Sequence, residues 1–227
     1  MATLRDDGAP ISKQNFCGND FSHADLSDRE FDHCDFSGCS FRGADLQRST
    51  FRHCQFNDSS SQTPADFSQA QLREAGFFNC NLTVVEFCKC TGYDLVFEHC
   101  QMQGADLSKS DFRLPIGATE LASFNMRHCN FSFGTLANNY LVGCTLSDSR
   151  LLEACFDYCD LSNANLTGSE LHNIHGGQLV LAGADLRGAT FNNIDPRRID
   201  LTGVHLEPEQ LPALLEPLGV VLHLDQT

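Results

Sequence analysis

Large apolar residues recur at every fifth position over most of the chain. A period of five matches neither the 3.6-residue period of an α-helix nor the two-residue period of a strand. The chain must therefore turn a corner with each repeat, and four repeats close a square coil of about 20 residues whose core faces its neighbours. The first run of central residues is Phe16, Phe21, Leu26, Phe31, Phe36, Phe41, Leu46, Phe51 and Phe56, and later runs begin at Phe67 and Leu121.

The residue two positions before a central residue is usually small, which predicts a second inward position with little room. Because a free cysteine packs as a small hydrophobe, cysteines in this position are expected in the core. The repeat reads A/C-D/N-L/F-x-x, with its other three positions outward. It predicts an all-β fold, a right-handed quadrilateral β-helix over residues 16–206, after an N-terminal extension at 1–15. The inward cysteines are Cys34, Cys39, Cys54, Cys80, Cys90, Cys100, Cys129, Cys144 and Cys159.

Two stretches break the five-residue frame, NDSSSQTPAD at 57–66 and RLPIGATE at 113–120. The first is one residue longer than two repeats require, and the second is one residue shorter. Both are rich in Ser, Thr, Pro or Gly, so we expect loops that leave the coil wall. A role in function and neutral variation at a tolerant surface turn explain such loops equally well.

The C-terminal segment at 207–227 departs from the repeat. Leu211, Leu214, Leu215 and Leu218 have the spacing of an amphipathic helix. Because an open solenoid end exposes backbone and core, a short helical cap is expected here. The apolar tail GVVLHL exceeds what capping needs, which leads to the hypothesis that these four leucines form a dimer interface.

The net charge of the chain limits the classes of partner that it can bind. The chain has 15 basic and 30 acidic residues, a formal net charge of −15. This argues against direct contact with nucleic acid or anionic lipid, and favours a partner with a basic groove. An acidic surface that serves only solubility is the simpler alternative. No run of about 18 apolar residues and no secretory segment is seen, so a cytoplasmic protein with reduced cysteines is expected.

The outward position before each central residue is often acidic. If a coil takes about 20 residues and the first loop adds one, Asp25, Asp45, Asp66, Glu86 and Asp106 share one column. Like charges about 4.8 Å apart destabilise a sheet, which favours a functional role. In the alternative, each aspartate bonds its own turn backbone. The acidic residues in this position are Asp20, Asp25, Glu30, Asp35, Asp45, Asp66, Glu86, Asp106, Asp111, Asp160, Glu170, Asp185 and Asp200.

The sequence predicts neither a metal site nor an enzyme. The dipeptide His-Cys occurs at residues 33–34, 53–54, 99–100 and 128–129, with the cysteine inward and the histidine outward. Adjacent residues on opposite sides of the wall cannot close one tetrahedral site. No phosphate-binding loop, nucleophile elbow or zinc-protease motif is present, so no cofactor is expected.

The A/C-D/N-L/F-x-x repeat resembles that of the pentapeptide repeat proteins. The stretch DPRRIDLTGVHL with the later LLEPLGVVL, residues 195–222, resembles the Qnr quinolone-resistance proteins among them. The resemblance implies a DNA-mimicking cytoplasmic homodimer, joined through its C-terminal ends, that binds DNA gyrase and topoisomerase IV and relieves quinolone inhibition. It also implies that both loops engage the topoisomerase. The loop residues carried over are Asp58, Ser59, Ser60, Ser61, Gln62, Thr63, Pro64, Arg113, Leu114, Pro115, Ile116, Gly117, Thr119 and Glu120.

Two other functions stay open at this point. The chain fits an acidic scaffold whose partner is not a topoisomerase, because the repeat alone does not specify a partner. It also fits a solenoid enzyme, which would require a cluster of groups with perturbed pKa values in a cleft.

Overall fold

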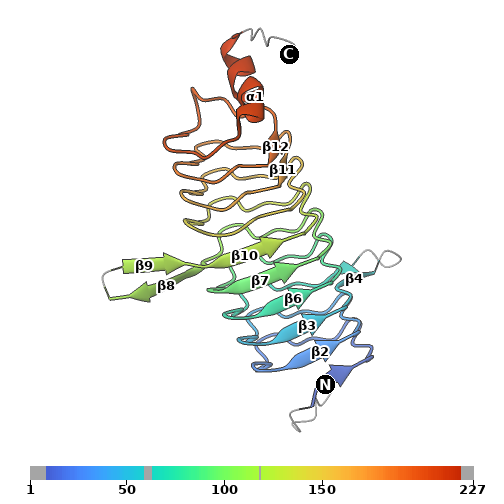
Figure 1. Ribbon diagram of the computed structural model, residues 1–227. Coiled ribbons are helices and arrows are strands. Elements are labelled where there is room, and N and C mark those ends of the chain that lie inside the picture. Colours follow the sequence, from blue (N-terminus) through green and yellow to red (C-terminus); the bar gives the residue numbers. More distant parts are fainter. Residues whose placement is uncertain (1–8, 59–62, 118, 221–227) are drawn as a thin grey trace.

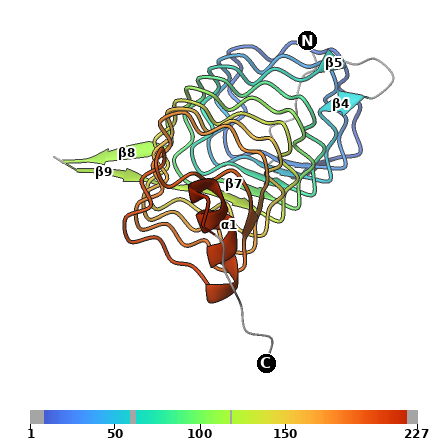
Figure 2. The same cartoon turned by 90° about the horizontal axis from the view of Figure 1, so that it is seen from above.

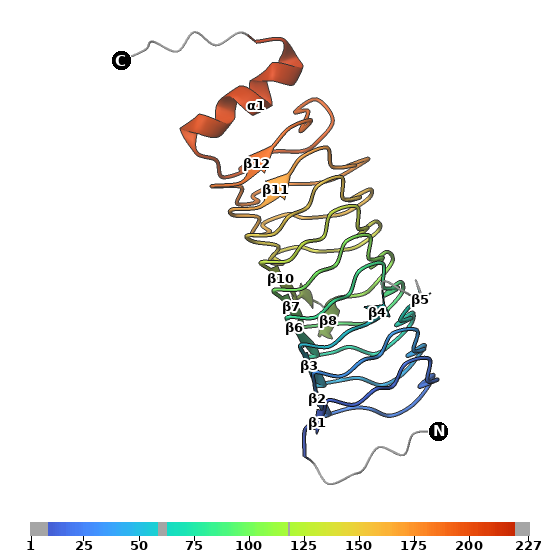
Figure 3. The same ribbon diagram turned by 90° about the vertical axis from the view of Figure 1, so that its right-hand side faces the viewer.

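The computed structural model describes residues 9–58, 63–117 and 119–220, and over them the chain winds into a four-sided, right-handed β-helix (Figures 1 and 3). One side is a six-stranded parallel sheet in the order β1-β2-β3-β6-β7-β10. Its register pairs Phe31 with Phe51, Phe51 with Phe77 and Phe77 with Phe97. These strands are β1 (Ile11–Ser12), β2 (Glu30–Asp32), β3 (Thr50–Arg52), β6 (Gly76–Phe78), β7 (Leu95–Glu98) and β10 (Phe124–Arg127).

The central residues stack along the axis, as the five-residue period predicts. We call the side with the six-stranded sheet face 1; face 2 carries Phe36, face 3 carries Phe41 and face 4 carries Leu46. Stacked rings lie 4.9 Å apart for Phe31 and Phe51 on face 1. The distance is 4.5 Å for Phe41 and Phe67 on face 3. One continuous apolar core therefore runs along the whole coil.

A tight turn closes most corners. The N–H of the residue three positions after a central residue donates to the central carbonyl, as Cys39 does to Phe36 at 3.0 Å. The residue before it takes a left-handed conformation, for example Gly38 with φ 67°, and His33 at a corner after face 1 also has a left-handed φ of 51°. The remaining bonds of the wall join neighbouring coils, so a corner residue is fixed by its backbone whatever its side chain.

The small inward position behaves as predicted. All nine cysteines in it are buried, and all twelve cysteines are free thiols. Several of these thiols donate to carbonyls of the preceding coil, as Cys39 Sγ does to the oxygen of Phe16 at 2.9 Å. Burial raises the pKa of Cys39 and of Cys159 to about 12, so both stay protonated in the core.

Two glycines replace central residues, and the small position then compensates. A Cβ on Gly92 would lie 3.1 Å from the Leu95 side chain, and a Cβ on Gly176 would lie 3.1 Å from Leu179. Both leucines occupy the normally small position and are fully or almost fully buried. The larger residue fills the volume that the glycine leaves, and the core stays continuous.

Both loops insert more residues into the coil than the five-residue frame predicted. Asp20 pairs with Ser40, so an uninterrupted wall would pair Ser40 with position 60, but its partner is Asp66. The first loop therefore adds six residues, not one, because β4 (Asn57–Asp58) and β5 (Thr63–Pro64) form a hairpin outside the wall. Ala65 and Asp66, which were predicted to lie in this loop, belong to the wall.

The second loop adds nine residues, since Gln101 pairs with Asn130. It forms a hairpin of β8 (Arg113–Ile116) and β9 (Thr119–Ala122). Leu121 was predicted as a central residue, but it lies on this hairpin and is 50 % exposed. Met126 takes that role, paired with Phe97. A count of residues cannot distinguish a short loop from a hairpin that is inserted between two repeats and contributes no repeat of its own.

The ends of the coil also differ from the prediction. Ile11 already pairs with Phe31, so the wall begins before residue 16. Near the other end, β11 (Glu170–Leu171) pairs with β12 (Thr190–Phe191). The C-terminal cap consists of η1 (Pro208–Gln210), α1 (Leu211–Leu215) and η2 (Glu216–Leu218). Within the described ranges, no helix is long and apolar enough to span a bilayer.

Candidate partner-binding surface

The two hairpins leave the coil at opposite corners (Figure 2). The first lies between Phe56 on face 2 and Phe67 on face 3, and the second lies between Phe112 on face 4 and Met126 on face 1. Both therefore stand away from the wall on different sides of the rod. A partner that contacts both must extend around it.

Arg113 fixes the base of the second hairpin. Its Nε donates to Asp111 Oδ1 at 2.8 Å, and its Nη1 donates to Glu120 Oε2 at 2.8 Å on the opposite strand. Its guanidinium also lies 5.9 Å from the centre of the Tyr140 ring. The bonds from Arg113 lower the pKa of Asp111. The hairpin is thus tied to the wall and across its own strands.

The projecting part of this hairpin is apolar. Ile116 and Leu121 are each about half exposed, and Gly117 at the tip has φ 62°. Beside the base lies a groove of about 210 Å³. Exposed apolar groups next to a groove with charged walls are typical of a protein contact. The groove is lined by Gln47, Gln71, Arg73, Thr91, Gly92, Tyr93, Asp111, Arg113 and Leu114.

The first hairpin is described only at its base. Asn57 pairs with Pro64, and Asp58 pairs with Thr63. A Cβ on Gly38 would lie 3.3 Å from the Thr63 methyl, so Thr63 packs close to the preceding coil. The predicted contact residues Ser59, Ser60, Ser61 and Gln62 lie outside the described residues.

The predicted acidic column does not exist as one column. Asp25 pairs with Asp45, but Asp45 pairs with Gln71, because the hairpin adds six residues rather than one. Asp66, Glu86 and Asp106 instead stack together on face 3, above Ser40. The five residues thus divide between faces 4 and 3, which are adjacent.

Acidic residues nonetheless concentrate on these two faces. Of the thirteen acidic residues in the position before a central residue, nine lie on faces 3 and 4. The remaining four lie on faces 1 and 2, so the rod is electrostatically two-sided in this position. The nine are Asp20, Asp66, Glu86 and Asp106 on face 3, and Asp25, Asp45, Asp111, Asp160 and Asp200 on face 4.

Most of these aspartates also have a local structural role. Asp25 accepts the backbone N–H of Ser27 at 3.1 Å, Asp66 that of Ser68 at 2.8 Å, and Asp106 that of Ser108 at 2.7 Å. Such turn bonds are what an Asx residue offers at a corner. An asparagine makes the same bond, as Asn165 does to Thr167 at 3.0 Å. The turn bond explains why aspartate or asparagine occupies this position, but it does not require the negative charge of aspartate.

Glu86 is the exception, because its longer side chain makes no turn bond. Burial raises its pKa, and the carboxylates of Asp106 and Asp66 in the same column add to this rise. A raised carboxyl pKa means that the ionised form is disfavoured in the folded state. Above both the unfolded and the folded pKa, the Glu86 charge therefore destabilises the fold, and below them this penalty disappears.

We expect Glu86→Gln to raise the free energy of unfolding at pH 7 by a few tenths of a kcal/mol, the usual scale of a like-charge contact between strands. The gain should shrink to nothing as the pH falls below the ordinary glutamate pKa. Urea denaturation at both pH values measures it. Glu30→Gln is the matched control, since Glu30 pairs with Thr50 and has no carboxylate neighbour in the described part of its column. An equal gain in both variants would contradict the interpretation.

The C-terminal cap closes the last coil. The Gln210 amide donates to the carbonyls of Leu186 and Ala189, both at 2.6 Å, and so ties the cap to the last coil. Leu214 is buried against the core, whereas Leu211 and Leu218 are exposed on the outer side. Leu214 thus acts within its own chain. The interface formed by Leu211, Leu214, Leu215 and Leu218 stays a prediction.

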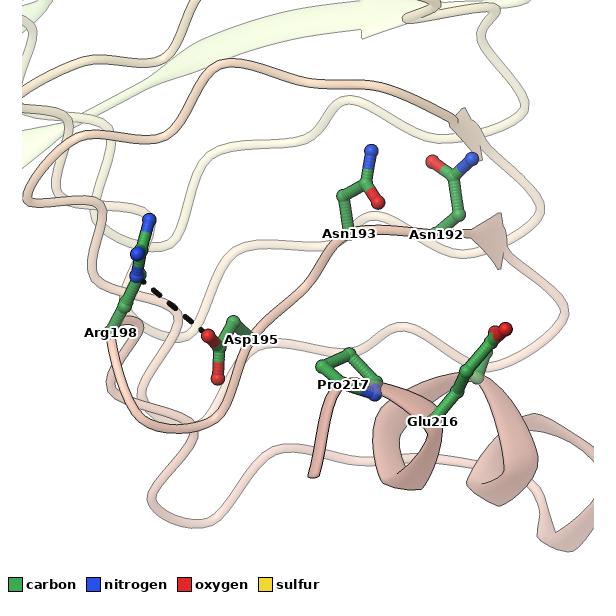
Figure 4. Close-up of a pocket in the computed structure, with 7 residues that line it drawn as sticks. Asn192, Asn193, Asp195, Arg198, Glu216 and Pro217 are labelled. Atoms are coloured by element: carbon green, nitrogen blue, oxygen red, sulfur yellow. Dashed lines mark ion pairs between the residues drawn. The ribbon is translucent and has the colours of Figure 1, made fainter. Parts of the chain in front are cut away.

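A second open cleft lies where the cap meets the last coil (Figure 4). Asp195 and Arg198 form an ion pair of 3.7 Å on its wall, and Glu216 and Pro217 of the cap also line the cleft. Arg197 Nη2 also donates to Asp195 at 2.9 Å, and these contacts lower the pKa of Asp195 to about 2. The DPRR turn is therefore a stable surface feature next to the exposed leucines.

Comparisons with known proteins agree with this architecture. The family model for pentapeptide repeats matches residues 20–58, 129–168, 146–174 and 180–207. The chain is 33 % identical to the pentapeptide repeat protein QnrB4 of Escherichia coli over 151 residues, which is 66 % of each chain. It is 30 % identical to the quinolone resistance pentapeptide repeat protein QnrB96 of Scandinavium goeteborgense over 144 residues, 63 % of this chain and 58 % of that protein. The two matches thus span 66 % and 58 % of the relatives' own lengths, less than two thirds in each case.

The similarity extends further in three dimensions. The structure of full-length QnrB1, described as a plasmid-mediated fluoroquinolone resistance protein, superposes with a TM-score of 0.87 at 28 % identity. That match covers 93 % of this chain and all of QnrB1. A four-sided coil of five-residue repeats defines a pentapeptide repeat protein, and the chain belongs to this family. Within the family it belongs with the Qnr proteins, and like them it is not an enzyme.

Sequence reasoning missed two features of this surface. The Arg113 bond to Glu120 joins two strands that meet only when the hairpin forms. The sequence argument compared His33 and His53 only with the cysteines adjacent to them in the chain, whereas the two histidines lie side by side on neighbouring coils. A search at the spacing of one whole coil would have found the second feature.

Proposed function

We propose that this protein is a quinolone-resistance protein that binds DNA gyrase and topoisomerase IV as a DNA mimic and protects them from quinolones. The observation that carries the proposal is the superposition on QnrB1 over that protein's full length. The rod with two projecting hairpins supplies what such an interaction needs: a rigid scaffold and apolar contacts at fixed positions (Figures 1 and 2).

The charge distribution supports contact with a DNA-binding groove. Faces 3 and 4 hold nine of the thirteen acidic residues in the position before a central residue. A basic channel that normally holds DNA attracts such a surface over long range. We expect the protein to meet this partner in the cytoplasm, because the free thiols of this chain persist there.

We further propose a homodimer joined through the C-terminal caps. Leu211, Leu218 and Val220 are each more than 40 % exposed at the end of the rod. Three exposed apolar side chains in one short segment are more typical of an interface than of a free surface. Two rods joined in this way would present their acidic faces over twice the length.

The direct test is a supercoiling assay with purified gyrase and a fluoroquinolone. Added at micromolar concentration, the protein is expected to restore supercoiling that the drug inhibits. Unchanged inhibition across that range would contradict the proposal and favour an acidic scaffold for a different partner.

A charge-reduced variant tests the mimicry separately. Asp66→Asn, Glu86→Gln and Asp106→Asn together remove three adjacent charges on face 3, while each asparagine keeps its turn bond. We expect this variant to bind gyrase more weakly, with a smaller dependence of affinity on salt. The same salt dependence in variant and wild type would remove these carboxylates from the contact.

A further inference from the structure

Asp32, His33 and His53 form a compact cluster at the corner that follows face 1. His33 Nδ1 lies 2.9 Å from Asp32 Oδ2, and His53 Nδ1 lies 3.2 Å from Asp32 Oδ1. The two imidazole rings are stacked with centres 4.6 Å apart and an angle of 23° between their planes. One carboxylate therefore holds a nitrogen from each of two histidines on neighbouring coils.

The backbone prepares this arrangement. His33 and His53 each follow a paired phenylalanine by two residues, and both have left-handed φ values of 51° and 52°. Their N–H groups donate to Arg52 and Phe78 of the next coil, both at 2.9 Å. Because the two corners are identical and in register, the imidazoles start from parallel positions one coil apart. The backbones of both histidines are therefore already in place before a ligand binds.

The spacing fits a transition-metal ion. With metal–nitrogen and metal–oxygen bonds of about 2.0–2.2 Å, neighbouring ligand atoms in a tetrahedral site are about 3.3 Å apart. The two nitrogen–oxygen distances of 2.9 and 3.2 Å are close to this value. All three ligand atoms lie within 4.8 Å of one another, and an ion binds once each imidazole has turned out of the stack so that its Nδ1 lone pair points at the ion. The nearby cation Arg52 lies over the Phe78 ring, at 4.5 Å from its centre.

The geometry points to a surface site for one divalent transition-metal ion of the zinc, nickel or copper class. Nδ1 of His33, Nδ1 of His53 and the Asp32 carboxylate are its protein ligands. Imidazole and carboxylate are ligands that these ions accept. The three side chains are between 37 % and 53 % exposed, which leaves the remaining coordination positions to water or to a group from a partner.

The chain contains a matched comparison. His99 and His128 are stacked in the same way, with centres 4.8 Å apart and an angle of 9°. The carboxylate beside them, Glu98, lies 3.8 Å from His99 Nε2 and bridges no second histidine in the described structure. Stacking alone is thus present at both pairs, and the shared carboxylate is present only at His33 and His53.

The experiment is a titration of the reduced, untagged protein with Co²⁺, followed by calorimetry and by the visible spectrum. We expect one equivalent to bind, with no thiolate charge-transfer band. His33→Asn and His53→Asn should each lower the affinity by at least about tenfold, because loss of a residue that only hydrogen-bonds to a metal ligand already costs that much. His128→Asn, checked alongside them by circular dichroism, should leave both the fold and the affinity unchanged.

Three results would overturn the assignment. The first is wild-type affinity in His33→Asn. The second is an equal loss in His128→Asn, which would mean that stacked histidines bind the ion without a shared carboxylate. The third is a thiolate band that persists in both site variants, which would place the ion on exposed Cys17 or on the partly exposed Cys88 and Cys155.

Discussion

Replacing Phe36 with alanine is expected to lower the free energy of unfolding by about 3–5 kcal/mol, as large-to-small substitutions in cores do. Phe36 is 1 % exposed and stacks between Phe16 at 5.0 Å and Phe56 at 5.4 Å. It also meets Phe31 and Phe41 edge to face. Rigid neighbours on four sides cannot close the cavity. Chemical denaturation followed by circular dichroism gives the value.

Phe133→Ala is the matched control for this substitution. Phe133 is 63 % exposed at a corner, so its removal opens no cavity. A change of less than about 0.5 kcal/mol is expected, as for most surface substitutions. If Phe36→Ala cost less than about 1 kcal/mol, far below the usual range for a core cavity, the continuous phenylalanine core could not be what stabilises the rod.

Excision of the second hairpin is expected to abolish protection of gyrase while leaving the fold intact. Arg113 and Ala122 are paired at its base, so Asn-Gly can replace residues 114–121 as a two-residue turn. The excised residues are outside the core, and the Arg113 bond to Asp111 remains. If the hairpin contributes about 2 kcal/mol to the binding free energy, as the central residues of an interface do, its loss lowers the affinity and hence the potency more than tenfold.

The supercoiling assay with a quinolone measures this effect, and thermal unfolding verifies the fold. Phe133→Ser is the control, because Phe133 is an exposed aromatic residue at the corner after face 2 that belongs to neither hairpin. Full rescue by the excised variant would remove the hairpin from the proposed contact. Loss of rescue in Phe133→Ser as well would point to a general effect of surface apolar residues.

The wall of this protein could be predicted from the sequence because every repeat obeys one local rule. Phe36 is buried, and Cys39 occupies the small inward position as the period requires. The hairpins could not be placed in the same way. Leu121 kept the apolar character of a central residue although it lies outside the wall. Antiparallel pairing within an insertion leaves no trace in a five-residue count.

The candidate surface was predicted less well for the same reason. A single misjudged loop length moved Asp66, Glu86 and Asp106 to another face, because each column depends on every residue that precedes it. The His33–His53 cluster depends on contacts between neighbouring coils, which no local motif reports. The resemblance to Qnr proteins was carried by the DPRR turn and cap, which are irregular and therefore distinctive.

The square cross-section has a consequence for how such proteins diverge in length. Four repeats return the chain to the same face, so inserting or deleting one whole coil shifts everything beyond it by about 4.8 Å along the axis and turns it only by the small rotation between neighbouring coils. The two hairpins and the cap, placed at fixed corners, would nearly keep their directions after such a change (Figure 2). Evolution can thus adjust the reach between contact points in uniform steps, while the angles at which they meet a partner change little.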